Sequence, residues 1–385
     1  MPRTVFYGIF VYMSAENKIV WHTWAKLGLL LLLALAISVF SLFPAWVERY
    51  YSISVYPRIA AILRISTGRV PFSIGDIVYV GLVIWLIVKT IQVTRLVYQK
   101  KYSHQVLWRF LFKLTRGILW VYIIFKLLWG LNYNRLGIEY QLAISKKGYS
   151  KEEVTALTNQ LIDKVNECRR QLKDTLLPVP ALDSIYREAY RSYQTVTYAF
   201  EFLNYRDISV KSSLFSGLGD YMGFSGYYNP FTGEAQLRTD IPRILIPFIA
   251  CHEMAHQLGY ASESEANFVG YLAAASSKDV YFRYSVYLDL FSYAQGEEII
   301  LYGKEKDFNS FQAVIKQNRE RLDTLVKKDR REIREFFYKR KNRISPAVSG
   351  LYDQYLKLNK QLKGVDSYNE VIGWLIAYQK KYGKL

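Results

Sequence analysis

Two histidines with a glutamate beside the first of them are the residues whose types and spacing most clearly indicate chemistry. Residues 252–256 read His-Glu-Met-Ala-His, which is an HExxH motif. Positions four residues apart share one face of an α-helix, so both imidazoles can bind the same metal ion. Glu253 then lies where it can act as general base toward water that the metal activates. We therefore expect His252 and His256 to be ligands of Zn²⁺.

A catalytic zinc site needs a third protein ligand and an open fourth position. The chain has only four histidines, and no other histidine follows the motif. Two acids do follow it, Glu263 and Glu265. Glu263 shares its helical face with small or polar residues, which allows close approach to the motif helix, whereas Glu265 can form a capping box with Ser262. The sequence favours Glu263 as the third ligand, with Glu265 as the alternative.

The residues after the motif carry a family resemblance. Residues 263–267 read Glu-Ser-Glu-Ala-Asn and resemble the second motif of gluzincin-like metallopeptidases. That resemblance implies Glu263 as a zinc ligand and Asn267 as a residue that supports a ligand histidine. With residues 230–235 and 251–257, the segment also looks like the bacterial membrane family known as domain of unknown function 3810. This resemblance implies three leading membrane helices followed by one zinc metallopeptidase domain.

The motif needs a helix to carry it, and the flanking residues predict one of about three turns. Pro247 is suited to the first turn and Gly259 to the end of the helix. Residues 208–241 are rich in Ser, Gly, Tyr and Phe, which predicts short strands and loops. Residues 234–238 alternate as an edge strand does; such a strand could bind an extended substrate, or it could belong to an ordinary hairpin.

The remainder of the polar region is expected to be helical. Ser150 and Glu153 predict a capping box at the start of a helix that reaches Lys173, and a second helix is expected over 181–193. Most of the chain from Pro247 onward also has a helical pattern. We therefore expect a mainly α protein whose residues 138–385 form a zincin-like α+β metallopeptidase domain.

Three apolar segments precede this domain, at about residues 27–47, 72–93 and 117–131. The first contains no charge over 21 residues, enough for a helix to cross a hydrocarbon core of about 30 Å. Interfacial aromatics, among them Trp120 and Trp129, flank the third. The sequence thus predicts a membrane anchor over residues 1–137 with three transmembrane helices.

The positive charge is concentrated in the same region. Of the net charge of +18, +12 falls within residues 1–131. The predicted loops and tails on the N-terminal side carry 9 Lys and Arg, against 7 on the other side. This bias favours a cytoplasmic N-terminus and an extracytoplasmic C-terminal domain in a multi-pass protein of the cell membrane. The expected partners are membrane lipid and a protein or peptide substrate.

A second basic stretch lies in the polar region. Residues 304–343 carry 14 Lys and Arg and 7 Asp and Glu, with a dense run at Lys339, Arg340 and Lys341. Elements that stack on bases or enter a groove are not evident, so no nucleic-acid partner is expected. The run is interpreted as a solvated helix face, with contact to anionic lipid headgroups as the functional alternative.

The composition excludes two classes of protein: 62 aromatic residues (8 Trp, 33 Tyr, 21 Phe) are too many for a disordered chain, and two cysteines are too few for a disulfide scaffold.

The favoured function is that of a membrane-anchored zinc metalloendopeptidase with Glu253 as general base. An intramembrane protease is one alternative. A non-catalytic envelope or scaffold protein with a structural or vestigial zinc site is the other. Tyr227, Tyr228 and Tyr368 are candidate oxyanion donors, and Cys251 is expected to be a core thiol.

Overall fold

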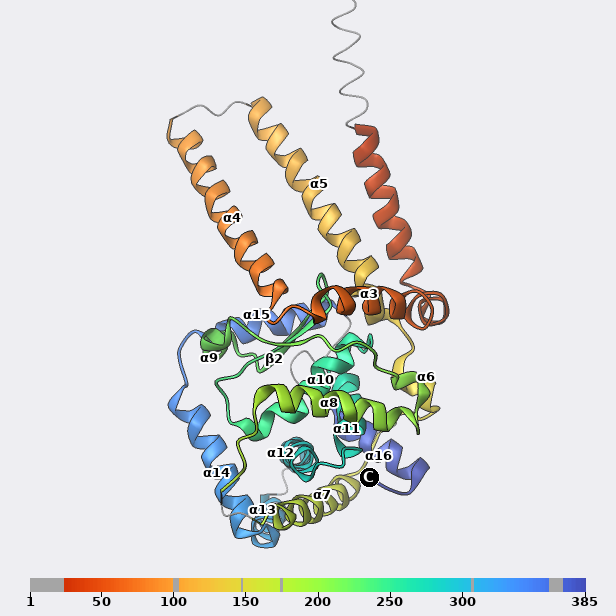
Figure 1. Ribbon diagram of the computed structural model, residues 1–385, viewed down its shortest axis with the longest axis vertical. Helices are drawn as coiled ribbons and strands as arrows, with labels where there is room; N and C mark the ends of the chain where they lie inside the picture. The colour runs from red at the N-terminus through yellow and green to blue at the C-terminus, as the bar shows by residue number, and fades with distance from the viewer. Residues whose placement is uncertain (1–23, 100–103, 147, 174–175, 306–307, 360–369) are drawn as a thin grey trace, which may run out of the picture.

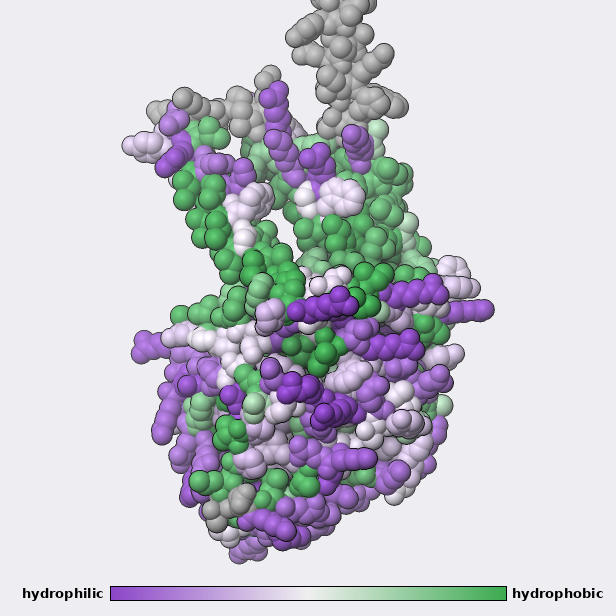
Figure 2. Space-filling view, viewed as in Figure 1, coloured by the Kyte–Doolittle hydropathy of each residue, from purple (hydrophilic) through white to green (hydrophobic). Residues whose placement is uncertain are grey.

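The computed structural model describes residues 24–99, 104–146, 148–173, 176–305, 308–359 and 370–385. The described chain is mainly α-helical and contains one three-stranded sheet. Three helices project side by side from one face of a rounded helical body (Figure 1). Hydrophobic surface covers the projecting helices, whereas hydrophilic residues cover most of the visible surface of the body (Figure 2).

The projecting helices are the helix Trp24–Phe40, α4 (Ile74–Tyr98) and α5 (His104–Leu128). Among the described helices, α4 alone is long and apolar enough by itself to cross a membrane. Most of its apolar side chains are exposed, which is costly in water and favourable in lipid. It begins at Ser73, whose hydroxyl accepts a hydrogen bond from the Asp76 N–H at 3.0 Å. The predicted apolar helix at 72–93 is thus confirmed.

The other two predicted spans differ from their expected form. The first is broken after Phe40: the helix Trp24–Phe40 and the segment Pro44–Ser52 meet at 97°, and they qualify as a span only when taken together. A helix cannot run unbroken through Pro44, because proline lacks the N–H that the helical ladder needs. α5 begins at His104 rather than at the expected 117, so it includes Arg109, Lys113 and Arg116, and it does not qualify. The described helices therefore give one or two candidate spans, not clearly three.

A layer of short elements lies between the projecting helices and the body. α3 (Tyr56–Gly68) lies crosswise beneath the projecting helices (Figure 1). It exposes Ile62 and Ile65 on one face and buries Tyr56 and Arg64 on the other. The remaining elements of this layer are α2 (Pro44–Trp46), η1 (Val47–Ser52), η2 (Gly130–Asn134) and α6 (Gly137–Leu142).

The body is built around two buried helices, α10 (Ile246–Gln257) and α11 (Glu263–Ala275), which pack against each other and against α8 (Leu182–Thr197). The predicted capping box of Ser150 and Glu153 is present at the start of α7. The other helical elements are α7 (Lys151–Gln171), η3 (Glu201–Leu203), η5 (Arg243–Leu245), α12 (Val280–Glu305), α13 (Phe308–Arg321), α14 (Thr324–Lys339), α15 (Ser345–Leu358) and α16 (Val371–Tyr382).

The sheet has the order β1-β3-β2, with β1 (Val210–Ser212) parallel and β2 (Gly226–Asn229) antiparallel to β3 (Glu234–Leu237). The connection from β1 to β2 contains η4 (Ser216–Leu218) and α9 (Gly219–Met222).

The prediction of an edge strand at 234–238 was wrong, because β3 is the central strand and all four of its residues are buried. Its polar side chains face the start of α4 rather than solvent. Glu234 accepts hydrogen bonds from the backbone N–H groups of Ile74 and Gly75, at 3.0 and 2.6 Å. The strands at the edges of the sheet are β1 and β2.

Candidate metal site

α10 carries the HExxH motif and is buried in the body, beneath α3 (Figure 1). Pro247 lies in its first turn, as predicted. After the helix ends, Gly259 has a φ of +89°, which a residue with a Cβ rarely adopts. A Cβ at that position would also lie 2.8 Å from the ring of Tyr56. Gly259 therefore turns the chain sharply enough for α11 to fold back against α10.

The two helices approach each other closely on the face that the sequence predicted. A Cβ built on Gly270 of α11 would lie only 3.0 Å from the backbone nitrogen of His252. A larger residue at this position would push the helices apart. The small face of α11 thus brings Glu263 across to the two histidines.

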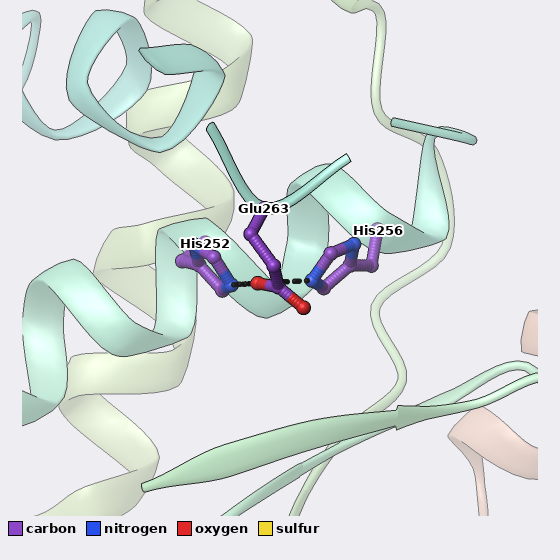
Figure 3. Close-up of side chains that lie close together, drawn as sticks. All are labelled: His252, His256 and Glu263. Carbon is purple, nitrogen blue, oxygen red and sulfur yellow. Dashed lines mark ion pairs between the residues drawn. The ribbon is translucent and has the colours of Figure 1, made fainter. Parts of the chain in front are cut away.

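His252, His256 and Glu263 converge on one point (Figure 3). Glu263 Oε2 lies 3.2 Å from His252 Nε2 and 3.5 Å from His256 Nε2. One potential ligand atom from each residue lies within 4.8 Å of the others, so the three can hold a metal ion. All three side chains are buried, with residues 5–7% exposed. The structure therefore brings together the three predicted ligands.

Neighbouring groups orient the donor atoms of this triad. His256 Nδ1 lies 2.7 Å from the carbonyl oxygen of Tyr260, so an Nδ1–H donates to it and the ring is held with its Nε2 toward Glu263. Burial lowers the pKa of His256, but Glu263 outweighs burial and raises it to about 9. Burial raises the pKa of Glu263, but the two histidines hold it below its usual range. Without a metal ion, the triad is thus an ion pair with an ionised Glu263.

Glu253 lies beside the triad and is held against the sheet. It is 4% exposed, and its Oε2 is buried without a hydrogen-bond partner among the described residues. A Cβ built on Gly226 of β2 would lie 2.7 Å from Glu253 Oε1, so the bare backbone of the edge strand packs directly on this carboxylate. Burial raises the pKa of Glu253 to about 6, although the histidines oppose the shift. A carboxylate with such a pKa is suited to accept a proton near neutral pH.

Two residues that the sequence did not indicate also lie at the site. The hydroxyl of Tyr352, on α15, donates to Glu263 Oε1 at 2.8 Å. Asp289, on α12, lies close enough to His252 for their charges to interact, and burial raises its pKa to about 6. Tyr352 is 89 positions from Glu263, and no local pattern marks it. Asn267 is buried one turn after Glu263 and hydrogen-bonds with Tyr293; its expected support of a ligand histidine stays a prediction.

Glu265, the alternative third ligand, has a different position. Its Oε1 accepts a hydrogen bond from the backbone N–H of Ile138 at 2.8 Å, at the start of α6. Ser262 makes no capping hydrogen bond with its side chain, so the predicted capping box of Ser262 and Glu265 was wrong. The carboxylate binds α6 instead because that helix begins beside it. Glu265 is therefore not part of the described triad.

The other candidate residues lie as follows. The hydroxyl of Tyr227 hydrogen-bonds with Asp76 and Ser213, and Tyr228 packs on Trp129 with ring centroids 5.2 Å apart. Tyr368 lies outside the described residues. Cys251 is fully buried, which confirms the prediction of a core thiol.

The C-terminal end of α10 is held by the layer beneath the projecting helices. Trp129 Nε1 donates to the carbonyl of His256 at 3.1 Å. Tyr56 and Arg64 of α3 donate to the carbonyl of Gln257 at 3.0 and 3.1 Å. These donors satisfy carbonyl groups that a helix end leaves unpaired. The ring of Trp129, the residue after α5, also lies 6.1 Å from that of His256, edge to face.

A family model described as Protein of unknown function (DUF3810) matches residues 51–376. The chain therefore belongs to this family. The matched region includes α4, α5 and all three residues of the triad. No curated protein and no solved structure matched the chain.

Proposed function

We propose that this protein is a zinc-dependent peptidase anchored in the cell membrane, with Glu253 as its general base. The convergence of His252, His256 and Glu263 supports this proposal most strongly. Two histidines and one glutamate are a donor set of catalytic zinc sites, whereas structural sites have four protein ligands. The buried, unpartnered Oε2 of Glu253 beside the triad adds a group suited to proton transfer.

Each residue of the site has a distinct role in the proposed reaction. When bound, Zn²⁺ supplies a Lewis acid that polarises the scissile carbonyl and acidifies water. His252, His256 and Glu263 would hold the ion, and the Tyr260 carbonyl keeps His256 in the orientation that this requires. Glu253 accepts the proton of the attacking water and passes it to the leaving amine. Tyr352, which reaches Glu263, is the described hydroxyl best placed to bind near the reacting carbonyl.

The position of β2 supports a peptide as the substrate. β2 is one of the two edge strands of the sheet, and its Gly226 packs on Glu253. An extended chain added to this edge would pass beside the general base and be held by backbone hydrogen bonds. A strand in this relation to an HExxH helix is also consistent with a zincin-like domain.

We further propose a multi-pass anchor of three helices, with the body outside the cytoplasm. The helix Trp24–Phe40, α4 and α5 project from the same face, which supports a common role (Figure 1). A reporter fused after Leu385 that is active only on the extracytoplasmic side is the expected result. A cytoplasmic signal would contradict the orientation.

The experiment that tests the enzymatic proposal compares the wild type with Glu253→Gln. The amide cannot accept the proton, so hydrolysis should fall by about a hundredfold or more, while zinc content by mass spectrometry stays stoichiometric. Glu332→Gln, on the exposed face of α14, is the matched control and should match the wild type. Full activity in Glu253→Gln, or a purified wild type without zinc, would contradict the proposal. Comparison of envelope proteomes from the same two strains should reveal the substrate as a protein that accumulates uncleaved.

The burial of the triad favours one second candidate, a scaffold protein with a structural metal ion. The three residues are only 5–7% exposed, and Tyr352 covers one of the carboxylate oxygens. For this candidate, metal removal lowers the melting temperature, and Glu253→Gln has no effect on any cellular phenotype.

A further inference from the structure

We propose that η4, α9 and α15 form a face that contacts anionic lipid and holds the metal site at the membrane surface. This inference rests on the proposed membrane anchoring and adds the substrate class: polypeptides that are themselves tethered to the membrane and are cut close to it. The face, called the lipid-contact face below, has five large exposed apolar side chains: Leu214, Leu218, Tyr221, Met222 and Leu351.

The elements that carry these exposed side chains lie on the anchor side of the body. α9 and α15 pack against each other, and both lie at the end of the body from which α4 projects (Figure 1). Hydrophobic surface gathers at this level, next to the base of α4 (Figure 2). α15, like α3, lies crosswise to α4, as a helix does that lies in the plane of a membrane interface. The apolar surface of the candidate span thus continues onto the body.

Basic residues border this apolar surface. Lys339, Lys341 and Arg343 are exposed at the junction of α14 and α15. Asn342, between them, donates to the carbonyl of Asp220 at 2.6 Å, which fixes the junction to α9. An apolar patch with a basic border is complementary to the acyl boundary and headgroups of anionic lipids. On this inference, the basic run near residues 339–343 contacts lipid headgroups instead of only solvent.

The metal site is connected to the same end of the body by three independent contacts. Tyr352, the neighbour of Leu351 on α15, reaches Glu263. Trp129, at the end of α5, contacts His256. In the first turn of α4, Asp76 binds Tyr227, the neighbour of the Gly226 that packs on Glu253.

Glu263, His256 and Glu253 are therefore each connected, through one or two residues, to an element at the membrane side. A site in this position reaches bonds near the bilayer, whereas the lipid-contact face would hinder access by a large soluble domain.

The lipid contact is tested by fluorescence quenching in nanodiscs of phosphatidylcholine and phosphatidylglycerol with brominated acyl chains. A fluorophore is attached to Leu218→Cys; both native cysteines are buried, so labelling is specific. Leu86→Cys on α4 is the control inside the membrane, and Lys316→Cys on α13, at the opposite end of the body, is the control outside it. We expect quenching at positions 218 and 86 but not at 316.

The outcomes separate this inference from the proposed anchoring. Quenching at position 86 with none at 218 overturns the lipid-contact face and leaves the anchoring intact. No quenching at position 86 overturns the anchoring and the inference together. Exchange of phosphatidylglycerol for phosphatidylcholine should weaken the quenching at 218 and leave that at 86 unchanged, because only the former depends on the basic border.

The substrate class is tested with one peptide tethered to the lipid through a Gly-Ser spacer of either three or twelve residues. An extended chain spans about 3.5 Å per residue, so a site about 30 Å from the bilayer would need about nine residues. We expect cleavage of both peptides, because the site lies at the surface. Cleavage of only the long-spacer peptide overturns the substrate class. Cleavage of neither overturns the proposed peptidase function, while the quenching result still decides the lipid contact.

Discussion

Gly226 offers the sharpest test of how the sheet positions Glu253, the proposed general base. In Gly226→Ala, the new Cβ would lie 2.7 Å from Glu253 Oε1 and 2.9 Å from its Cγ, whereas ordinary contacts begin at 3.4 Å. The carboxylate must therefore move by about 0.7 Å, since it is the flexible partner of the pair. A displacement of about 1 Å in a catalytic group can cost about a hundredfold in rate, so we expect kcat to fall by about ten- to a hundredfold. This corresponds to about 1.4–2.7 kcal/mol in the activation free energy.

The assay measures kcat, zinc content and melting temperature for Gly226→Ala and for Gly217→Ala. Gly217 lies in η4, and a Cβ added there would have no atom within 4 Å, so its substitution controls for the loss of a glycine in the same region. The zinc content should stay stoichiometric in both variants, because neither site contacts the triad. A Gly226→Ala variant with wild-type kcat would refute the view that β2 fixes Glu253. Loss of zinc from that variant would instead show that the strand supports the ligands.

Three further predictions concern the ligands and the buried charges. Glu263→Ala should lose stoichiometric zinc, as measured by mass spectrometry. Glu265→Ala should keep zinc but be less stable, because the Glu265 carboxylate binds the start of α6. The reverse pattern would make Glu265 the ligand. Burial raises the pKa of Glu298 to about 7, so ionisation destabilises the fold from about pH 4.5 upward and fully above pH 7. Glu298→Gln should therefore raise the unfolding free energy at pH 8 by up to about 3 kcal/mol and change it little at pH 4; equal effects at both pH values would contradict this. Arg169 pairs with Asp329 at 2.7 Å, and both side chains are at most 2% exposed. Arg169→Met should therefore lower the unfolding free energy, measured with denaturant, by about 3–5 kcal/mol, because it leaves a buried carboxylate without its cation. A variant as stable as the wild type would contradict this.

The convergence of the three triad residues could be predicted from the sequence because the signals are local. His252 and His256 share a helical face through their spacing alone. Glu263 could be separated from Glu265 by the small residues on its face, and the contact of Gly270 with His252 is the packing that this pattern requires. The start of α7 followed from the capping chemistry of Ser150 and Glu153 in the same way.

The residues that complete the site could not be predicted, because their positions depend on tertiary packing. Tyr352 reaches Glu263 from a distant helix, and nothing in the neighbouring residues marks it. The alternation in β3 indicated an edge strand because Glu234 and Gln236 are polar. Their partners, Gly75 and Ser73, belong to the start of α4, so a buried polar contact had the pattern of a solvated face.

The contacts at the end of α10 determine how this protein can be dissected. A fragment that begins at residue 138 would retain every metal ligand but lose Tyr56, Arg64 and Trp129, the donors to the last carbonyls of the motif helix. It would also expose the side of the helix end that these residues cover. Removal of the apolar N-terminal third, the usual route to a soluble protein, is thus expected to damage the proposed catalytic centre itself. We therefore expect the smallest autonomously folding unit to begin before Tyr56, and biochemical work to need the chain from that point onward in detergent or lipid.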